Sequence, residues 1–160
     1  MGLVFDASSL IILNEIGLLP DVVRLPIALA TTDEVLKEVH STTVHELSRR
    51  GAIGIVNASP MTVPPEIRLR LGGGEISVIA WVVENPAYWA VLDERLARDA
   101  ARKLDIRFLG TARLIKHLAD KGILTFDRAR SLLESLPRIG FYIREDTTRL
   151  VLSESQLEIE

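Results

Sequence analysis

Four carboxylates stand where the chain is expected to pass from one secondary-structure element to the next. Asp6 closes the apolar run LVFD, and Asp93 closes YWAVLD. Glu38 lies in the helix-like segment DEVLKEV, and Glu75 follows the glycines at 72–74 at a helix start. Glu38, Glu75 and Asp93 taken singly could each be a solvated charge or a cap favoured by the helix dipole, whereas a carboxylate such as Asp6 that closes a buried strand is harder to explain in that way. Taken together, the four would converge beyond the carboxyl ends of parallel strands.

Such a cluster restricts the chemistry that the chain can perform. Like charges gathered at one place repel, so the cluster needs a divalent cation or raised pKa values. Carboxylate oxygens are hard ligands, which favours Mg²⁺ or Mn²⁺. Two such ions, about 3.5–4 Å apart, can clamp the attacking water and the leaving oxygen of a phosphodiester. The residues therefore point to hydrolysis of nucleic acid.

Strands are expected to alternate with helices along the sequence, and together they would position these acids. Apolar runs predict strands at residues 2–6, 27–30, 53–58, 88–92 and 106–109. Helical spacing predicts helices at residues 8–17, 75–84, 94–105, 111–121 and 126–136. The alternation predicts a three-layer α/β fold with a mainly parallel sheet, in one domain over residues 1–160.

The boundaries of some elements follow from capping residues and prolines. The expected caps are Ser8 or Ser9 for the first helix, Thr31 for the second and Thr111 for a later one. The helix after residue 31 either runs on to 51 or breaks at 41–43. A proline-rich loop is expected at 60–66, and an extended segment at 140–143.

Composition narrows the class of protein. The chain has 160 residues, 48% of them hydrophobic and 26% charged, as in a globular domain. No apolar run approaches the length of a membrane span and no signal peptide is seen, so we expect a cytoplasmic protein. Cysteine is absent, which excludes thiolate chemistry, and side-chain amides are scarce, as in thermophilic proteins. The net charge of −3 gives no global attraction to RNA.

Successive segments resemble the PIN-like proteins related to VapC-type toxin ribonucleases. The matching blocks are FDASSLI, EVLKEV, GGGEISVIA, VLDERLARDAARKLDIRFLGT, LADKGIL and LPRIGFYI. The resemblance implies a Mg²⁺- or Mn²⁺-dependent endoribonuclease that uses water as its nucleophile. It also implies homodimers and, for a toxin, a small antitoxin protein encoded by a neighbouring reading frame. A housekeeping nuclease would lack that neighbour.

The resemblance assigns roles to particular residues. It places the family's acidic quartet on Asp6, Glu38, Glu75 and Asp93. Asp6, Glu75 and Asp93 would hold the ions, with Glu94 as an auxiliary ligand, and Glu38 would orient or deprotonate the attacking water. Ser8 would support a ligand carboxylate by a hydrogen bond. The chain departs from the family at Ser9, where proline is usual, and at Ser77, where an acid or amide is usual.

Three arginines follow Asp93 on one helical face. Arg95, Arg98 and Arg102 are spaced to receive RNA phosphates, although Glu94 and Asp99 could instead tie them down as a solvated face. The resemblance also carries an arginine at position 98. The remaining aromatic and imidazole side chains are expected to be structural: Trp81, Trp89 and Phe108 in the core, and His40, His45 and His117 at the surface or partly buried.

Two alternatives to a nuclease remain open. A catalytically silent PIN-like module that binds RNA or a protein partner is supported by Ser77, and it would bind Mg²⁺ or Mn²⁺ weakly. A receiver-type signalling domain would need two adjacent acids after the first strand, but Ala7 and Ser8 follow Asp6. The glycines at 72–74 fit no phosphate-loop pattern.

The segment 8–19 is more apolar than one core-facing helix stripe requires. It contains Leu10, Ile11, Leu13, Ile16, Leu18 and Leu19. We therefore expect part of this surface to be exposed in a monomer and covered by a second copy in a homodimer. Pairing two copies would also place two arginine-bearing helices along one RNA.

Overall fold

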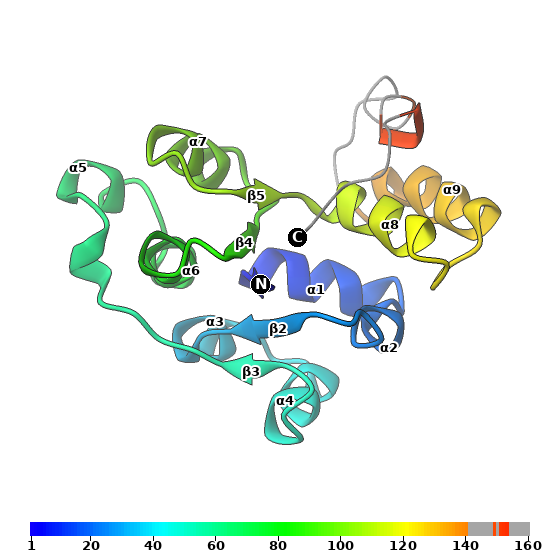
Figure 1. The fold of residues 1–160 in the computed structure, drawn as a ribbon, viewed down its shortest axis with the longest axis horizontal. Coiled ribbons are helices and arrows are strands. Elements are labelled where there is room, and N and C mark those ends of the chain that lie inside the picture. The colour runs from blue at the N-terminus through cyan, green and yellow to red at the C-terminus, as the bar shows by residue number, and fades with distance from the viewer. Residues whose placement is uncertain (141–148, 150, 154–160) are drawn as a thin grey trace.

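The apolar run at the start of the chain forms the central strand of a parallel sheet. The computed structural model describes residues 1–140, 149 and 151–153. In this part of the chain the sheet has five strands in the order β3-β2-β1-β4-β5, all parallel (Figure 1). The strands are β1 (Gly2–Phe5), β2 (Ala28–Thr31), β3 (Gly54–Ile55), β4 (Tyr88–Val91) and β5 (Phe108–Leu109).

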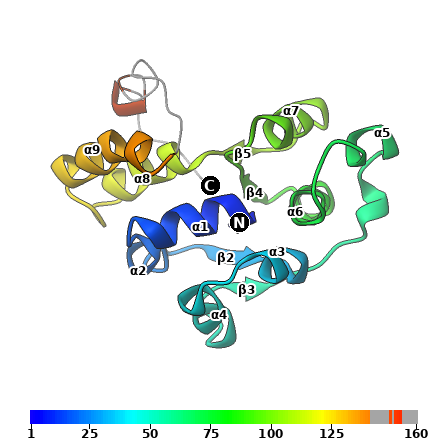
Figure 2. The same ribbon diagram turned by 180° about the vertical axis from the view of Figure 1, so that it is seen from behind.

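Helices connect the strands and complete the three-layer α/β fold expected from the sequence. They are α1 (Ala7–Glu15), α2 (Leu19–Val22), α3 (Asp33–Glu38), α4 (Thr42–Arg49), α5 (Pro65–Arg68), α6 (Gly73–Glu84), α7 (Arg95–Lys103), α8 (Thr111–Asp120) and α9 (Phe126–Ser135). Helices α3 and α4 lie beside β2 and β3 in both views, and α7 lies beside β5 (Figures 1 and 2). Helices α8 and α9 pack as a pair.

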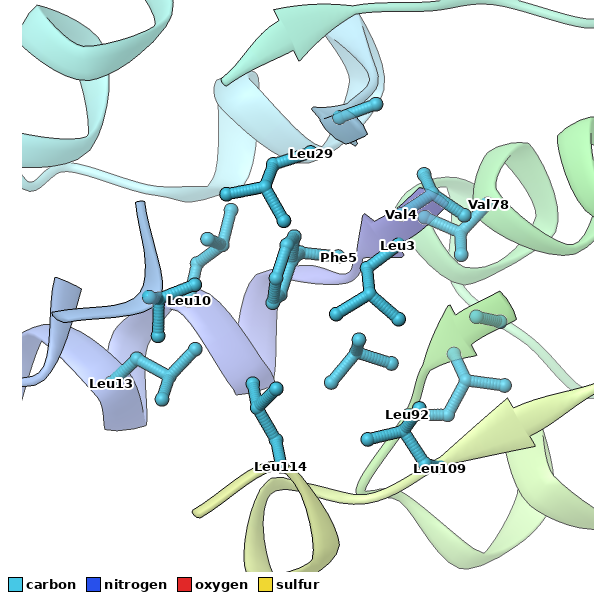
Figure 3. Close-up of a cluster of buried hydrophobic side chains, with 14 of the residues drawn as sticks. Leu3, Val4, Phe5, Leu10, Leu13, Leu29, Val78, Leu92, Leu109 and Leu114 are labelled. Carbon is cyan, nitrogen blue, oxygen red and sulfur yellow. The ribbon is translucent and has the colours of Figure 1, made fainter. Parts of the chain in front are cut away.

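The core forms on both faces of β1 because successive side chains of a strand point to opposite faces. Leu3 and Phe5 point into a cluster with Leu10 of α1 and Leu114 of α8 (Figure 3). Val4 points the other way, and Figure 3 shows it beside Val78 of α6. All of these side chains are buried, so the central strand is covered on both faces, as parallel sheets require.

Several caps differ from the sequence expectation. Asp6, and not Ser8 or Ser9, caps α1 by accepting a hydrogen bond from the Ser9 N–H. Thr32, and not Thr31, caps α3, because Thr31 still belongs to β2 and donates to the Phe5 carbonyl. Thr111 is the first residue of α8, and its hydroxyl donates elsewhere.

Other boundaries are resolved by the structure. The helix after β2 breaks, and Ser41 caps the second part, α4. The expected loop at 60–66 contains a 3₁₀ turn, Pro60–Thr62, and the start of α5. Another 3₁₀ turn, Leu136–Ile139, follows α9. The segment expected to be extended, 140–143, lies outside the described residues beyond Gly140.

The expectation of a broad exposed apolar surface on residues 8–19 is wrong. Leu10 and Leu13 of α1 are buried, as are Leu18 and Leu19, because α2 folds back and α3, α4 and α8 also contact α1. Only Ile11 of this segment is a clearly exposed large hydrophobic residue, with 40% of its surface accessible. The homodimer therefore loses most of its expected basis and stays a prediction.

Two side-chain expectations also need correction. His117 is buried, with 1% exposed, although it was expected at or near the surface, because α9 packs on α8. Trp81, Trp89 and Phe108 are only partly buried and pack against the edge of the core.

The strand order argues against the receiver-type fold, which has the order 2-1-3-4-5. Within the described residues, no helix combines the length and the apolar character that a membrane crossing needs.

Replacing Leu3 by alanine should lower the free energy of unfolding by about 3–5 kcal/mol, because it opens a cavity beside the central strand. Leu69→Ala is the matched control, since Leu69 is 87% exposed and the same atoms are removed without a cavity. Urea unfolding of both variants measures the difference. Equal losses would contradict the packing described above.

Candidate functional site

Asp6 is a buried carboxylate at the carboxyl end of the central strand. Its Oδ1 accepts a hydrogen bond from the Ser9 N–H at 2.8 Å, which caps α1. Its Oδ2 is buried and has no hydrogen-bond partner among the described residues, and only 1% of the residue is exposed. The pKa of Asp6 is raised to about 7, chiefly by burial, with the charges of Asp93 and Glu75 adding to the rise and the hydrogen bonds from Ser9 opposing it. A carboxylate in this state is suited to receive a cation.

Asp93 lies beyond the end of β4, the neighbour of β1 in the sheet. Thr111 holds both of its oxygens: the backbone N–H donates to Oδ1 at 2.8 Å and the hydroxyl to Oδ2 at 2.5 Å. Burial raises the pKa of Asp93, and the Glu94 charge adds to the rise, whereas the Thr111 bonds and the Arg98 charge lower it. Thr111 therefore fixes this carboxylate in one orientation.

Glu75 lies in the first turn of α6, as the glycine run predicted. Its Oε2 accepts a hydrogen bond from the Gly72 N–H at 3.0 Å, which ties the acid to the helix start. Burial raises the pKa of Glu75, and the charges of Glu94 and Glu38 raise it further, while the Gly72 bond lowers it. The Glu75 carboxylate therefore interacts electrostatically with Glu38 at the end of α3 and with Glu94 at the start of α7.

Glu38 is the last residue of α3 and reaches across to α6. Its Oε1 accepts a hydrogen bond from the Gly74 N–H at 3.0 Å. A Cβ at position 74 would lie 2.8 Å from that oxygen, so a residue larger than glycine would push the carboxylate away. Helices α3 and α6 pack on each other, which carries Glu38 toward Glu75.

Ser8 contacts Glu94 and not one of the quartet. Its Oγ donates to Glu94 Oε1 at 3.3 Å. Glu94 occupies the N-cap position of α7 and is exposed. The hydrogen bond that Ser8 was predicted to donate to a ligand carboxylate is therefore made to Glu94, the predicted auxiliary ligand.

The two positions that depart from the family both make internal hydrogen bonds. Ser9 Oγ donates to the Asp6 carbonyl at 3.0 Å, with the Val91 carbonyl at 3.4 Å, linking β1 to β4. Ser77 is buried and donates to the Gly74 carbonyl at 2.6 Å, and its hydroxyl also pairs with that of Thr32 at 2.6 Å. Ser77 therefore anchors the first turn of α6, which carries Glu75.

Sequence reasoning missed Thr111, Thr32 and Gly74 as supports of the acids. A hydroxyl residue just after a strand was taken as an ordinary helix cap, because caps and carboxylate partners have the same residue type and position. The signal for Gly74 was present in the glycine run, but only the structure shows that Glu38 needs the space.

The acids form a connected cluster. Asp6 interacts electrostatically with Asp93 and Glu75, Glu75 with Glu94 and Glu38, and Asp93 with Glu94. No group of three or more His, Asp or Glu side chains in residues 1–140, 149 and 151–153 is already arranged to hold a metal ion. The donor chemistry nevertheless fits a hard cation, because Asp6 Oδ2 is buried and unpartnered, and Asp6 interacts electrostatically with Asp93 and Glu75, whose pKa values are also raised.

The three arginines expected to bind RNA are not equivalent. Arg95 and Arg102 pair with Asp99, at 3.8 Å and 2.7 Å. Arg98 donates through Nε to the Leu92 carbonyl at 2.9 Å and lies close enough to Asp93 to lower its pKa. Only Arg98 therefore belongs to the surroundings of the acids.

The pKa of Asp6 leads to a stability prediction for the metal-free protein. Because the folded pKa is above the ordinary value of 3.8, the contribution of Asp6 favours folding at low pH and is lost as the pH rises through about 7. Asparagine does not titrate, so the unfolding free energy of Asp6→Asn minus that of wild type should be larger at pH 8 than at pH 5 by on the order of 2 kcal/mol.

Chemical denaturation in the presence of a chelator at both pH values measures this gain. Asp127→Asn, on the exposed surface of α9, is the control and should differ from wild type by a constant amount. A pH-independent difference for Asp6→Asn would contradict the buried, cation-ready state of Asp6.

A scan against protein-family models matches residues 2–156 to the family described as PIN domain. A search of curated proteins finds no match to this sequence. The match covers nearly the whole chain and agrees with the parallel sheet and its strand order. PIN domains are commonly nucleases that use Mg²⁺ or Mn²⁺. This chain belongs to the PIN-domain family.

Proposed function

We propose that this chain is a metal-dependent endoribonuclease that hydrolyses RNA phosphodiester bonds, with residues 1–160 acting as one nuclease domain. The observation that carries the proposal is the buried, unpartnered Oδ2 of Asp6 at the carboxyl end of β1, in a residue that interacts electrostatically with Asp93, beyond the end of β4, and with Glu75. A structural aspartate at this depth would be expected to have both oxygens satisfied. Family membership supports the same reading.

Asp6, Glu75 and Asp93 would hold Mg²⁺ or Mn²⁺, with Glu94 as the auxiliary ligand. A bound ion of this kind supplies a Lewis acid that activates water and neutralises charge on the phosphate. The protein keeps the ligands in place beforehand: Ser9 orients Asp6, Thr111 orients Asp93 and Gly72 orients Glu75. This preorganisation lowers the cost of ordering the site when substrate arrives.

Glu38 would accept the proton of the attacking water. One of its oxygens is held by Gly74, and its exposure leaves the carboxylate open to solvent. Arg98 would favour the ionised form of Asp93 and present positive charge to the phosphate. The contact of Glu38 with Gly74 and the position of Arg98 beside Asp93 support these two roles.

The biological role that we propose is that of a cytoplasmic toxin ribonuclease, neutralised by a small antitoxin protein and working as a homodimer. The resemblance of the successive sequence blocks supports this role. Arrest of bacterial growth on expression, relieved in Asp6→Asn and by co-expression of a neighbouring small protein, would test it. Sizing by light scattering would test the homodimer.

The silent RNA- or protein-binding module is the second candidate. It is favoured by the absence of a ready three-ligand group among the described residues. Calorimetric titration with Mn²⁺ separates the two, because a nuclease should bind the ion in wild type and lose this binding in Asp6→Asn. Equal heats for both proteins would favour the silent module.

The purified protein should cleave single-stranded RNA only when Mg²⁺ or Mn²⁺ is present. Asp6→Asn should reduce the rate at least about 100-fold, because the substitution removes the central ligand charge. Gel analysis of a labelled RNA measures cleavage, and Asp127→Asn serves as the matched control. Undiminished cleavage in Asp6→Asn or in excess chelator would contradict the mechanism.

Cleavage should also depend on the space at Gly74. Gly74→Ala should lower kcat about tenfold or more, because its methyl group displaces the Glu38 carboxylate that acts as base. Gly73→Ala is the control, since a Cβ there meets only an ordinary contact at 3.6 Å from Glu34. Equal rates for the two variants, with Gly74→Ala folded by circular dichroism, would remove Glu38 from the mechanism.

A further inference from the structure

A groove of about 480 Å³ lies along β5 and combines arginines with aromatic rings. Two of its arginines, Arg98 and Arg102, come from α7, Arg107 immediately precedes β5, and Arg113 comes from α8. Trp89 of β4 and Phe108 of β5 supply the rings. Strand β5 is an edge strand of the sheet in the described residues, so these side chains gather at the edge opposite β3.

The arginines are stacked on the rings. The Arg102 guanidinium carbon lies 5.4 Å from the centre of the Phe108 ring, and that of Arg107 lies 5.5 Å from the centre of the Trp89 ring. Stacking of this kind uses the face of the guanidinium, and the N–H groups lie in its plane. One N–H of Arg102 donates to Asp99 Oδ1 and one of Arg107 donates to the Pro86 carbonyl, so the remaining N–H groups of each guanidinium can donate to phosphate. The rings in turn are half-buried, so they are held in position from one side.

The charge of the groove contrasts with that of the whole chain. Its described lining residues include four arginines and no carboxylate, whereas the chain carries a net charge of −3. The neighbouring groove between α5 and α7 is mixed, because Glu66 and Asp99 line it together with basic residues. A polyanion would therefore be attracted to the groove along β5.

The groove reaches the proposed catalytic acids. Gly110 and Arg98 both line it. A Cβ at Gly110 would lie 3.1 Å from Asp93 Oδ1, and Arg98 hydrogen-bonds to the carbonyl of Leu92, next to Asp93. A strand of RNA lying in the groove would thus continue toward Asp93.

We propose that this groove binds the single-stranded segment of RNA that flanks the scissile phosphate, with phosphates on Arg107 and Arg113 and a base stacked on the Arg102 guanidinium that lies over the Phe108 ring. The proposal rests on the ribonuclease function proposed above and names how that site holds its substrate. Stacking on a planar group accepts any base, and contacts from arginine to phosphate read no sequence. The groove therefore supplies affinity without base preference.

Binding can be measured without cleavage by fluorescence anisotropy in EDTA, using labelled 12-nucleotide oligouridylate and oligoadenylate. The double variant Arg107→Gln and Arg113→Gln removes two exposed charges from the groove. Arg49→Gln with Arg50→Gln removes two exposed charges from the end of α4, beside β3, and is the matched control. Circular dichroism and thermal melting establish that all variants fold.

The groove double variant should bind both RNAs about tenfold more weakly at 0.1 M salt. The slope of log affinity against log salt should fall in magnitude by about 1.4, since each lost contact from a cation to phosphate in a single strand contributes about 0.7. Phe108→Leu should weaken binding of both RNAs about five- to tenfold with an unchanged salt slope, because it removes the ring that supports the stacked Arg102 guanidinium but removes no charge. The control should stay within about twofold of wild type.

Three outcomes would overturn the groove as an RNA site. The groove double variant could bind as tightly as the control, or wild type could fail to bind either RNA. A third outcome is a change in oligomeric mass with unaltered RNA affinity, which would mean that the groove holds a second copy of the chain. Cleavage of RNA by wild type in Mg²⁺ is scored separately, so a failed nuclease and a failed groove give different results.

Discussion

A buried negative charge at the end of the central strand is the constraint around which this fold is arranged. Asp6 follows a strand that is paired on both sides and covered on both faces, so its carboxylate cannot reach bulk water. The protein satisfies one oxygen by using it to cap α1 and leaves the other without a described partner. The raised pKa reflects that cost, and perturbed pKa values of this kind cluster at functional sites.

The sheet topology explains why a second acid lies beside the first. Strands β1 and β4 are distant in sequence but adjacent in the sheet, and their register pairs Phe5 with Val91. Asp6 therefore lies one residue, and Asp93 two residues, beyond this last pair, at the same edge of the sheet. The strand order reverses between β1 and β4, which is where parallel α/β sheets open a crevice for ligands. Helix α6 packs against both β1 and β4, and its first turn carries Glu75.

The sequence contained enough information for the sheet and for the acids, because both depend on local patterns. A short apolar run followed by Asp6 or Asp93 marks a strand end whatever the rest of the chain does. The supports of those acids depend on tertiary contacts instead. Thr111 is indistinguishable from a helix cap until β5 places it on Asp93, and the leucines of residues 8–19 look excessive until α2 folds back over them. Family resemblance supplied the roles but not these contacts.

The acidic cluster is unfavourable for binding a polyanion, and the arginines beside it offset this repulsion. The five electrostatically connected carboxylates would repel a polyanion such as RNA unless cations neutralised them, and the net charge of −3 would add to that repulsion. Screening confines both effects to about 10 Å at ordinary salt, so nearby charges would decide where the proposed RNA substrate first binds. The groove along β5 adjoins Asp93 at Gly110 and Arg98, and Arg102, Arg107 and Arg113 line the rest of it. A substrate held there would approach the acids from a surface that already neutralises its phosphates, so affinity and catalysis would be assigned to adjoining and oppositely charged parts of the same sheet edge.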